Sequence, residues 1–337
     1  MAFSYPSALG VHVDRPLTNF AVDFSRDKNT FISNVLFPTM TVDKMSDKYW
    51  RFDSLDAFRR TAATDNLWPI GENSEPNTAH FGKDLGTYQC KRYARQHVVP
   101  YEFSSNADFA YDQKAVSMLT SLIGIERLIQ GFAAATSGLT GTVATETAAN
   151  LSGGKWDVGV PTTAGSSFLR EGILEVVRRI MQNSMNTVDP RNLWCCISPT
   201  TAKLWAISLE VIDFVKQSPS AIAAMTNGSE FSNGPWFGLP RVLFGVNIMV
   251  ISPVYVTTEE GGADTKSYLV NDSAIFLNVE SPGLMTYNTI TGFEYEPMNI
   301  RTYDLGWKAQ RNIQCVTNMD YVCTALNSGF YVTDTDT

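Results

Sequence analysis

The sequence predicts an α+β fold with interleaved helices and strands, and three observations support this prediction. Polar and apolar residues alternate over 48–52 and again over 88–93, which is typical of strands. Residues 111–135 repeat apolar side chains every three to four positions, which indicates a long helix. The C-terminal third is again rich in β-forming residues, and the chain has no internal repeat. Such a mixture, without alternating β-α units, is typical of the α+β class.

The composition is that of a folded protein with few surface charges. The chain has 337 residues and a mass of 37.3 kDa, which suits one large or two ordinary domains. Its 26 basic and 34 acidic residues give a net charge of −8, which argues against a dedicated nucleic-acid binder because such proteins carry a basic footprint. Only 18% of the residues are charged while 12% are aromatic, so we expect a surface that partners partly cover.

The cysteines and the hydropathy argue against several classes of protein. The chain has five cysteines: Cys90, Cys195, Cys196, Cys315 and Cys323. Their odd number and the lack of Cys-x-x-Cys spacing predict neither a disulfide framework nor a metal site, and no cofactor is expected. The N-terminus lacks the basic flank and apolar centre of a signal peptide. The most apolar stretch, 118–135, is interrupted by Glu126 and Arg127, so no membrane span is expected. A reducing cytoplasm is the expected location.

The N-terminal hundred residues predict two segments with little core of their own. Residues 1–34 have no sustained period and are predicted to form an extended arm that lies on another surface. Residues 44–95 carry dense charges of both signs, and their two alternating stretches flank a turn-rich region. This pattern predicts a two-stranded projection, which would rest on a neighbour because an isolated hairpin is marginally stable in water.

Several residues of this projection are candidates for contacts between subunits. The aromatic residues Trp50, Phe52 and Trp68 would have no core to enter in a two-stranded projection, which favours a partner surface. Arg59 and Arg60 could contact a phosphate, but aspartates flank them in the sequence. A solvated face or an ion pair between subunits is therefore the preferred interpretation.

The middle and C-terminal parts predict a series of shorter elements. Asp112 and Gly138 are the expected N-cap and C-terminal stop of the 111–135 helix, whose wide apolar stripe, including Met118 and Leu122, predicts burial on more than one side. Residues 137–165 are glycine-rich and predict a mobile loop. A helix is expected over 167–185, and Asp189-Pro190 ends the segment that contains it. A buried strand over 194–197 and a helix opened by Ser198-Pro199 follow. Strands are expected over 242–251, 268–277 and 313–326.

Signatures of catalysis are few. The sequence has no phosphate-binding glycine loop and no Gly-x-Ser-x-Gly elbow, and its three histidines are scattered: His12, His80 and His97. The adjacent Cys195 and Cys196 could be redox-active or nucleophilic thiols. They lie in an apolar strand, however, so we expect buried structural cysteines, because reactive thiols need an electropositive and partly exposed setting.

The middle of the chain resembles the major capsid proteins of tailed bacteriophages. The resemblance lies in Lys155-Trp156-Asp157, the helix over 167–185, the run 189–194 and Ile197-Ser198-Pro199. It continues in Lys203-Leu204-Trp205, in residues 211–216 and in residues 243–248. No single motif is diagnostic, but the order and spacing of these runs together are specific, and the resemblance covers nearly the whole chain.

This resemblance implies a domain organisation and a set of partners. The parts would be an N-arm (1–42), an extended β-hairpin loop (43–96), a peripheral domain with the long spine helix (97–137), an axial α/β domain (138–285), and return strands of the peripheral domain with the C-terminus (286–337). The implied partners are identical subunits in pentamers and hexamers, a portal protein, and packaged DNA bound without sequence specificity, with decoration proteins as an option. Because the arm begins at Met1, a separate scaffolding protein is expected. Some relatives crosslink a loop lysine to an asparagine, and Lys83 with Asn299 or Asn312 would be the candidates here. Non-covalent contacts between subunits are the preferred expectation.

The implied function is that of a structural subunit, without catalysis, of an icosahedral shell that encloses double-stranded DNA in the virion. One alternative keeps the fold and changes the contents: an encapsulin-type compartment that holds enzyme cargo. The other alternative is a cytosolic thiol or hydrolytic enzyme that uses Cys195 or Cys196 with a histidine. The enzyme hypothesis leaves the arm and the projection unexplained, so the shell is preferred.

Overall fold

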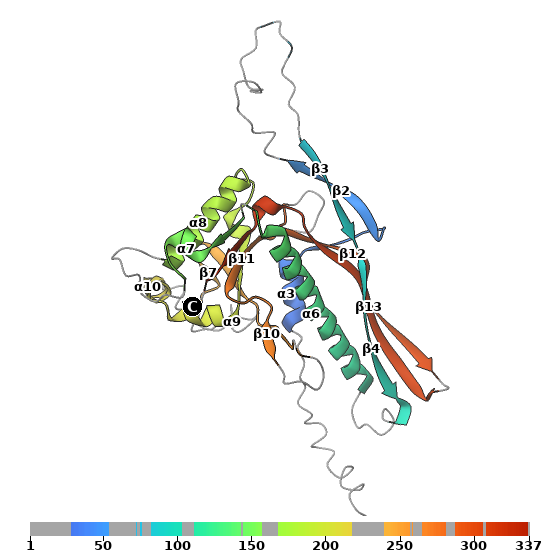
Figure 1. Cartoon of the computed structure of the whole chain (residues 1–337). Helices are drawn as coiled ribbons and strands as arrows, with labels where there is room; N and C mark the ends of the chain where they lie inside the picture. Colours follow the sequence, from blue (N-terminus) through green and yellow to red (C-terminus); the bar gives the residue numbers. More distant parts are fainter. Residues whose placement is uncertain are drawn as a thin grey trace, which may run out of the picture.

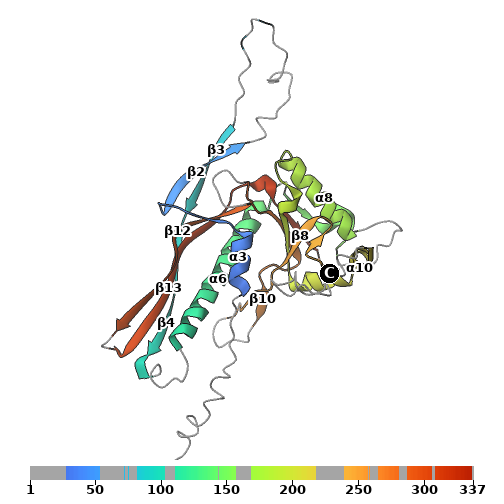
Figure 2. The same cartoon turned by 180° about the vertical axis from the view of Figure 1, so that it is seen from behind.

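A computed structural model describes residues 28–53, 72, 75, 82–102, 111–142, 144–156, 168–217, 239–256, 258, 265–280, 287–305 and 308–335. These residues form a six-stranded sheet surrounded by helices, a long four-stranded sheet beside one long helix, and a two-stranded hairpin that projects beyond both (Figure 1). The reverse view shows the same separation of the parts (Figure 2).

The four-stranded sheet has the order β1 (Thr39–Thr41), β12 (Ile290–Leu305), β13 (Gln310–Cys323) and β4 (Lys91–Pro100). β12 and β13 form a long antiparallel hairpin, and β1 joins β12 in parallel at its inner end. The register shifts twice between Glu294 and Asn299, so the hairpin bends there. One face packs against α6 (Tyr111–Leu139) through a small apolar core: Val99, Ala115, Leu119, Ile123, Ile313 and Cys315.

The long helix predicted over 111–135 is confirmed as α6, which begins at Tyr111 as predicted, but both predicted capping residues are wrong. Asp112 is the second residue of α6 rather than its N-cap, and its carboxylate instead accepts a 2.8 Å hydrogen bond from Arg311. Gly138 lies inside the helix, where a Cβ would come within 2.5 Å of the Cβ of Cys323, so close packing explains this glycine. The chain leaves the helix through Gly141, which has a φ of 75°.

A short helix, α3 (Lys28–Leu36), packs against α6 through Ile32, Leu36 and Phe37 (Figure 1). The ring of Phe37 meets that of Phe132 edge to face at 5.2 Å. For residues 28–34 the prediction of an extended arm is therefore wrong. Residues 1–27 lie outside the described part of the chain.

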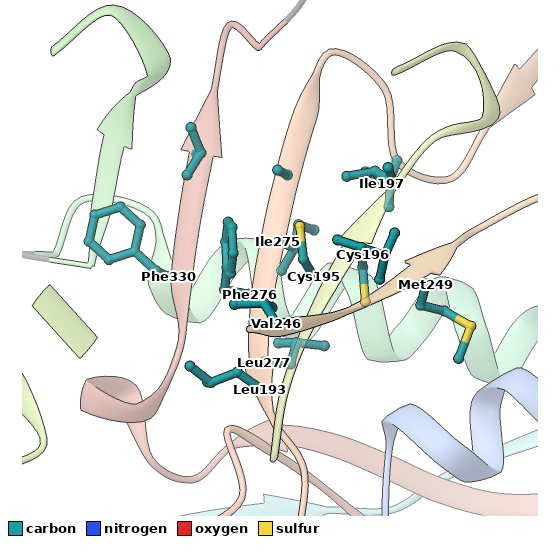
Figure 3. Close-up of a cluster of buried hydrophobic side chains, with 14 of the residues drawn as sticks. Leu193, Cys195, Cys196, Ile197, Val246, Met249, Ile275, Phe276, Leu277 and Phe330 are labelled. Carbon is teal, nitrogen blue, oxygen red and sulfur yellow. The ribbon is translucent and has the colours of Figure 1, made fainter. Parts of the chain in front are cut away.

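The main core surrounds the six-stranded sheet, whose order is β5 (Thr145–Thr147), β14 (Phe330–Thr333), β11 (Ser273–Asn278), β6 (Leu193–Ile197), β8 (Val246–Val250) and β7 (Val242–Leu243). All six residues of β11 are buried. Figure 3 shows the side chains of β6, β8 and β11 packed together in this core. Around the sheet lie α7 (Ala148–Ser152), α8 (Phe168–Asn183), α9 (Pro199–Ile207) and α10 (Leu209–Gln217) (Figure 1).

The elements predicted from strong local signals are confirmed. The 167–185 helix is α8, the 194–197 strand is β6, and Ser198 caps α9 by accepting a 3.0 Å hydrogen bond from the Thr201 amide. Smaller elements complete the described chain: the 3₁₀ turns Pro190–Asn192 and Leu326–Ser328, and the paired strands β9 (Val254–Val256) and β10 (Lys266–Tyr268).

Three expectations for this region are wrong. Within the loop expected over 137–165, residues 145–152 form β5 and α7, and Thr147 caps α7. Residues 157–165 lie outside the described part of the chain. The single strand expected over 242–251 is a hairpin, because Phe244 and Gly245 adopt φ values of 50° and 89° and reverse the chain between β7 and β8. The strand expected over 268–277 is divided between β10 and β11.

Gly172 of α8 is expected to be intolerant of a side chain. A Cβ there would lie 2.4 Å from Nε1 of Trp156, which is fully buried and donates to Ser152 Oγ at 3.1 Å. Gly172→Ala should therefore destabilise the fold by about 1–3 kcal/mol, despite the roughly 1 kcal/mol that alanine gains over glycine in a helix. Urea unfolding measures the effect, and the exposed neighbour variant Glu171→Ala is the control. A Gly172→Ala variant as stable as the wild type would contradict this packing.

Glu175 of α8 predicts a dependence of stability on pH. Hydrogen bonds from Arg178, at 2.6 and 2.7 Å, and from Arg179 lower the pKa of Glu175 from 4.5 to about 2. Because the folded pKa lies below the unfolded one, these pairs stabilise the fold fully above about pH 5, and their contribution is lost between about pH 4.5 and 2. The wild type should exceed Glu175→Gln in unfolding midpoint at pH 7, and the gap should close in that window. Since Arg178 is mostly exposed, the gap should be small. A gap that widens on acidification would contradict the assignment, and Glu171→Gln is the control.

Candidate inter-subunit surface

A two-stranded projection is present as predicted, formed by β2 (Ser46–Asp53) and β3 (Gly82–Gln89). The stretch over 88–93 that was expected to be its second strand is divided at Cys90, however, and Lys91 onward belongs to β4 of the four-stranded sheet. β2 and β3 pair antiparallel from Ser46 opposite Gln89 to Asp53 opposite Gly82. The hairpin extends away from the end of the four-stranded sheet (Figures 1 and 2). Two tyrosines attach its base to β12: Tyr88 stacks on Phe293 at 4.5 Å between ring centroids, and Tyr49 lies 5.5 Å from the same ring.

The inner face of the hairpin is closed by Tyr49. Its ring lies over Gly86, where a Cβ would come within 2.3 Å of the ring, so glycine is required opposite this tyrosine. Burial raises the pKa of the Tyr49 hydroxyl. At the adjoining position Arg51 donates to Asp84 at 2.7 Å, and this hydrogen bond lowers the pKa of the Asp84 carboxyl. Ring packing thus fixes the base of the hairpin, and an ion pair joins its two strands farther out.

The outer face of the hairpin presents apolar side chains to solvent. Trp50 lies opposite Leu85 in the register, and successive strand residues point to opposite faces, so this pair faces away from Tyr49 and Gly86. Trp50 is 62% exposed and Leu85 is 45% exposed. An exposed tryptophan beside an exposed leucine is a concentrated apolar surface that a partner would desolvate favourably.

The structure describes three of the six predicted contact residues, and all three lie on the β2–β3 hairpin. Trp50 lies on the outer face just described. Phe52 and Lys83 occupy opposite positions in the β2–β3 register. Three of the six lie outside the described residues: Arg59, Arg60 and Trp68. The contact role of all six stays a prediction. Sequence reasoning missed Leu85, because only the register shows that it lies beside Trp50.

Two further apolar pairs are exposed in the described chain. Met118 and Leu122 lie one turn apart on α6, and Ile207 and Leu209 flank the junction of α9 and α10. The sequence placed Met118 and Leu122 within a buried stripe, which is wrong for the single chain. α3 and the sheet cover only part of the circumference of α6.

Of the residues considered for catalysis, the structure describes Cys195, Cys196 and His97, while His12 and His80 lie outside the described residues. Cys195 and Cys196 are fully buried in β6, and burial raises the pKa of both thiols (Figure 3). A thiol of that kind carries little thiolate at neutral pH. Within the described ranges, no three histidine, cysteine, aspartate or glutamate side chains are grouped so that they could hold a metal. None of the helices described here is both long and apolar enough to cross a membrane.

Comparison with known proteins gives matches of structure but not of sequence. No protein-family model and no curated protein matches this chain. A phage-related protein from Bordetella bronchiseptica RB50 matches with a TM-score of 0.61 and 13% identity, over 91% of this chain and 92% of that chain. A chain of the capsid of cyanophage P-SCSP1u matches with a TM-score of 0.56 and 9% identity, over 88% and 86% of the two chains. The chain has the phage capsid fold.

A third match supports the same assignment. A chain from the structure of Mycobacterium phage Bobi has a TM-score of 0.56 at 10% identity, over 94% of this chain and 93% of that one. The fold expected from the resemblance, that of the tailed-phage major capsid proteins, is therefore confirmed. At these identities the capsid fold is what the likeness establishes, and function has to be argued from the surface described above.

Proposed function

We propose that this chain is the structural subunit of an icosahedral capsid that encloses the double-stranded DNA of a tailed phage. The observation that carries the proposal is the combination of the capsid fold with the exposed Trp50–Leu85 pair on a projecting hairpin. A projecting hairpin with apolar side chains on its outer face is best explained by burial of that face against a second copy.

Assembly would proceed through many contacts of ordinary size. Each subunit would place its hairpin on one neighbour and receive another neighbour's hairpin, so that each subunit is held by several contacts at once in a closed lattice. The proposed parts of the subunit are the N-arm (1–42), the extended loop (43–96), the peripheral domain (97–137 and 286–337) and the axial domain (138–285). The last strand, β14, pairs with β11 and β5 in the six-stranded sheet. The C-terminal end of the chain therefore contributes to that sheet as well.

The proposed partners follow from this role. They are identical subunits in pentamers and hexamers, a separate scaffolding protein, a portal protein and packaged DNA held without sequence recognition, with decoration proteins as an option. The proposed location is the virion after assembly in the host cytoplasm, and no catalysis is proposed. If Lys83 forms a crosslink, Asn299 is the better partner because it is exposed on β12. Asn312 is disfavoured because it is buried in β13.

Deleting residues 1–27 tests the arm and keeps the whole of α3, which begins at Lys28 and packs in the core through Ile32 and Leu36. We expect the shortened chain to fold but to form incomplete or aberrant particles. Thermal unfolding checks the fold, and electron microscopy counts closed shells. Closed shells in wild-type yield would contradict a role for the arm. Particles that carry enzyme cargo instead of DNA in the infected host would favour the encapsulin alternative.

A further inference from the structure

The outer edge of β4 combines an open strand with unpaired positive charge. β4 is the last strand of the four-stranded sheet, and among the described residues its side away from β13 has no strand partner. It contains no acidic residue, and Lys91, Arg92 and Arg95 are all exposed. None of these three cations has an ion-pair partner in the part of the chain that the structure describes, whereas Arg311 on the next strand is paired with Asp112.

These two features together define what the edge can bind. The unpaired N–H and C=O groups of an edge strand are a template for one more strand. Lys91 and Arg95 lie on one face of β4 about 13 Å apart, at roughly 3.3 Å per residue, and Arg92 lies on the other face. An added strand alternates its side chains with the same period, so acidic residues along it would meet these cations on both faces.

We propose that the β4 edge accepts an acidic, extended polypeptide segment of a partner protein as an additional strand. Duplex DNA fits less well, because it makes no use of the open backbone groups and because a chain of net charge −8 repels it. Charges on an edge also prevent pairing with an identical edge, and the same charges then select an acidic strand over a second β4. This inference adds a partner of defined chemistry to the proposed function but does not depend on it, because binding is measured whether or not the chain assembles.

Peptide binding to the full-length chain tests the proposal. The probe is a fluorescent ten-residue peptide of alternating threonine and glutamate, matched to the ten residues of β4, at about 50 mM salt. We expect saturable binding that weakens with salt, and slower amide exchange in β4 when the peptide is bound. Arg92→Glu/Arg95→Glu should weaken binding about tenfold or more and should gain affinity for an alternating threonine–lysine peptide. Arg191→Glu/Lys203→Glu, which changes the net charge equally at exposed sites elsewhere, should bind like the wild type.

Several results would overturn the inference. They are no binding of the acidic peptide at low salt, equal binding by both charge-reversed variants, unchanged exchange of the β4 amides, or tighter binding of a short DNA duplex than of the peptide. Arg92→Gln/Arg95→Gln removes the charge without reversing it and should lose part of the binding. This variant tests the inference if charge reversal impairs folding. Particle formation is scored separately by electron microscopy, so a chain that assembles but ignores the peptide refutes this inference alone.

Discussion

Trp50→Ala is expected to raise the concentration needed for assembly by about thirtyfold or more and to leave the folded subunit intact. A buried tryptophan at the centre of an interface contributes about 2 kcal/mol or more, and each 1.4 kcal/mol is about tenfold in affinity. Because Trp50 is 62% exposed in the single chain, its removal should change the free energy of unfolding by less than about 0.5 kcal/mol. Light scattering over a concentration series measures assembly, and thermal unfolding measures the fold.

Two variants serve as controls for this result. Trp50→Phe keeps most of the apolar area and should assemble at a concentration close to that of the wild type. Leu85→Ala, the cross-strand neighbour, should act in the same direction as Trp50→Ala with a smaller effect, since less area is lost. If Trp50→Ala assembles like the wild type, the outer face of the hairpin is not an interface.

Arg127→Met is expected to destabilise the subunit by about 3–5 kcal/mol. Arg127 of α6 places Nη2 2.6 Å from Oε1 of Glu294 on β12, and the two side chains are only 10% and 9% exposed. The pair lies beside Tyr321, whose pKa is raised by burial, so the surroundings are poorly solvated. Removing one partner leaves the other as an uncompensated buried charge, which is the costly change. Chemical unfolding of the purified subunit measures the loss.

A double variant distinguishes the cost of one unpaired buried charge from the contribution of the ion pair itself. Arg127→Met/Glu294→Leu removes both charges and replaces them with apolar side chains, so it should recover most of the stability lost in Arg127→Met. If the double variant is as unstable as the sum of the single variants, the two residues act independently and the ion pair does not join α6 to β12.

The parts of the fold that sequence reasoning predicted well carry local signals. α8 has an apolar stripe on one side, β6 is a short apolar run, and α9 opens with the Ser198-Pro199 cap, each readable within a few residues. The projection was predicted from its alternation and its turn-rich centre. These features depend on neighbours in the sequence rather than on distant contacts.

The parts that were missed depend on contacts distant in the sequence. Gly138 reads as a helix stop, but it is set by the approach of Cys323. Arg127 reads as an interruption of an apolar stretch, and only the packing of α6 on β12 supplies Glu294 as its partner. For the candidate surface, Trp50 was predicted from its type, whereas Leu85 required the register of β2 and β3. α3 has a weak apolar pattern and is fixed by its contacts with α6.

Electron microscopy of the purified full-length chain, expressed alone and with a candidate scaffolding protein, tests the central claim most directly. The account predicts closed shells of uniform diameter with icosahedral symmetry, in which the β2–β3 hairpin of each subunit lies on a neighbour and Trp50 is buried. A chain that stays a stable monomer under every condition, or shells in which Trp50 remains exposed to solvent, would contradict it.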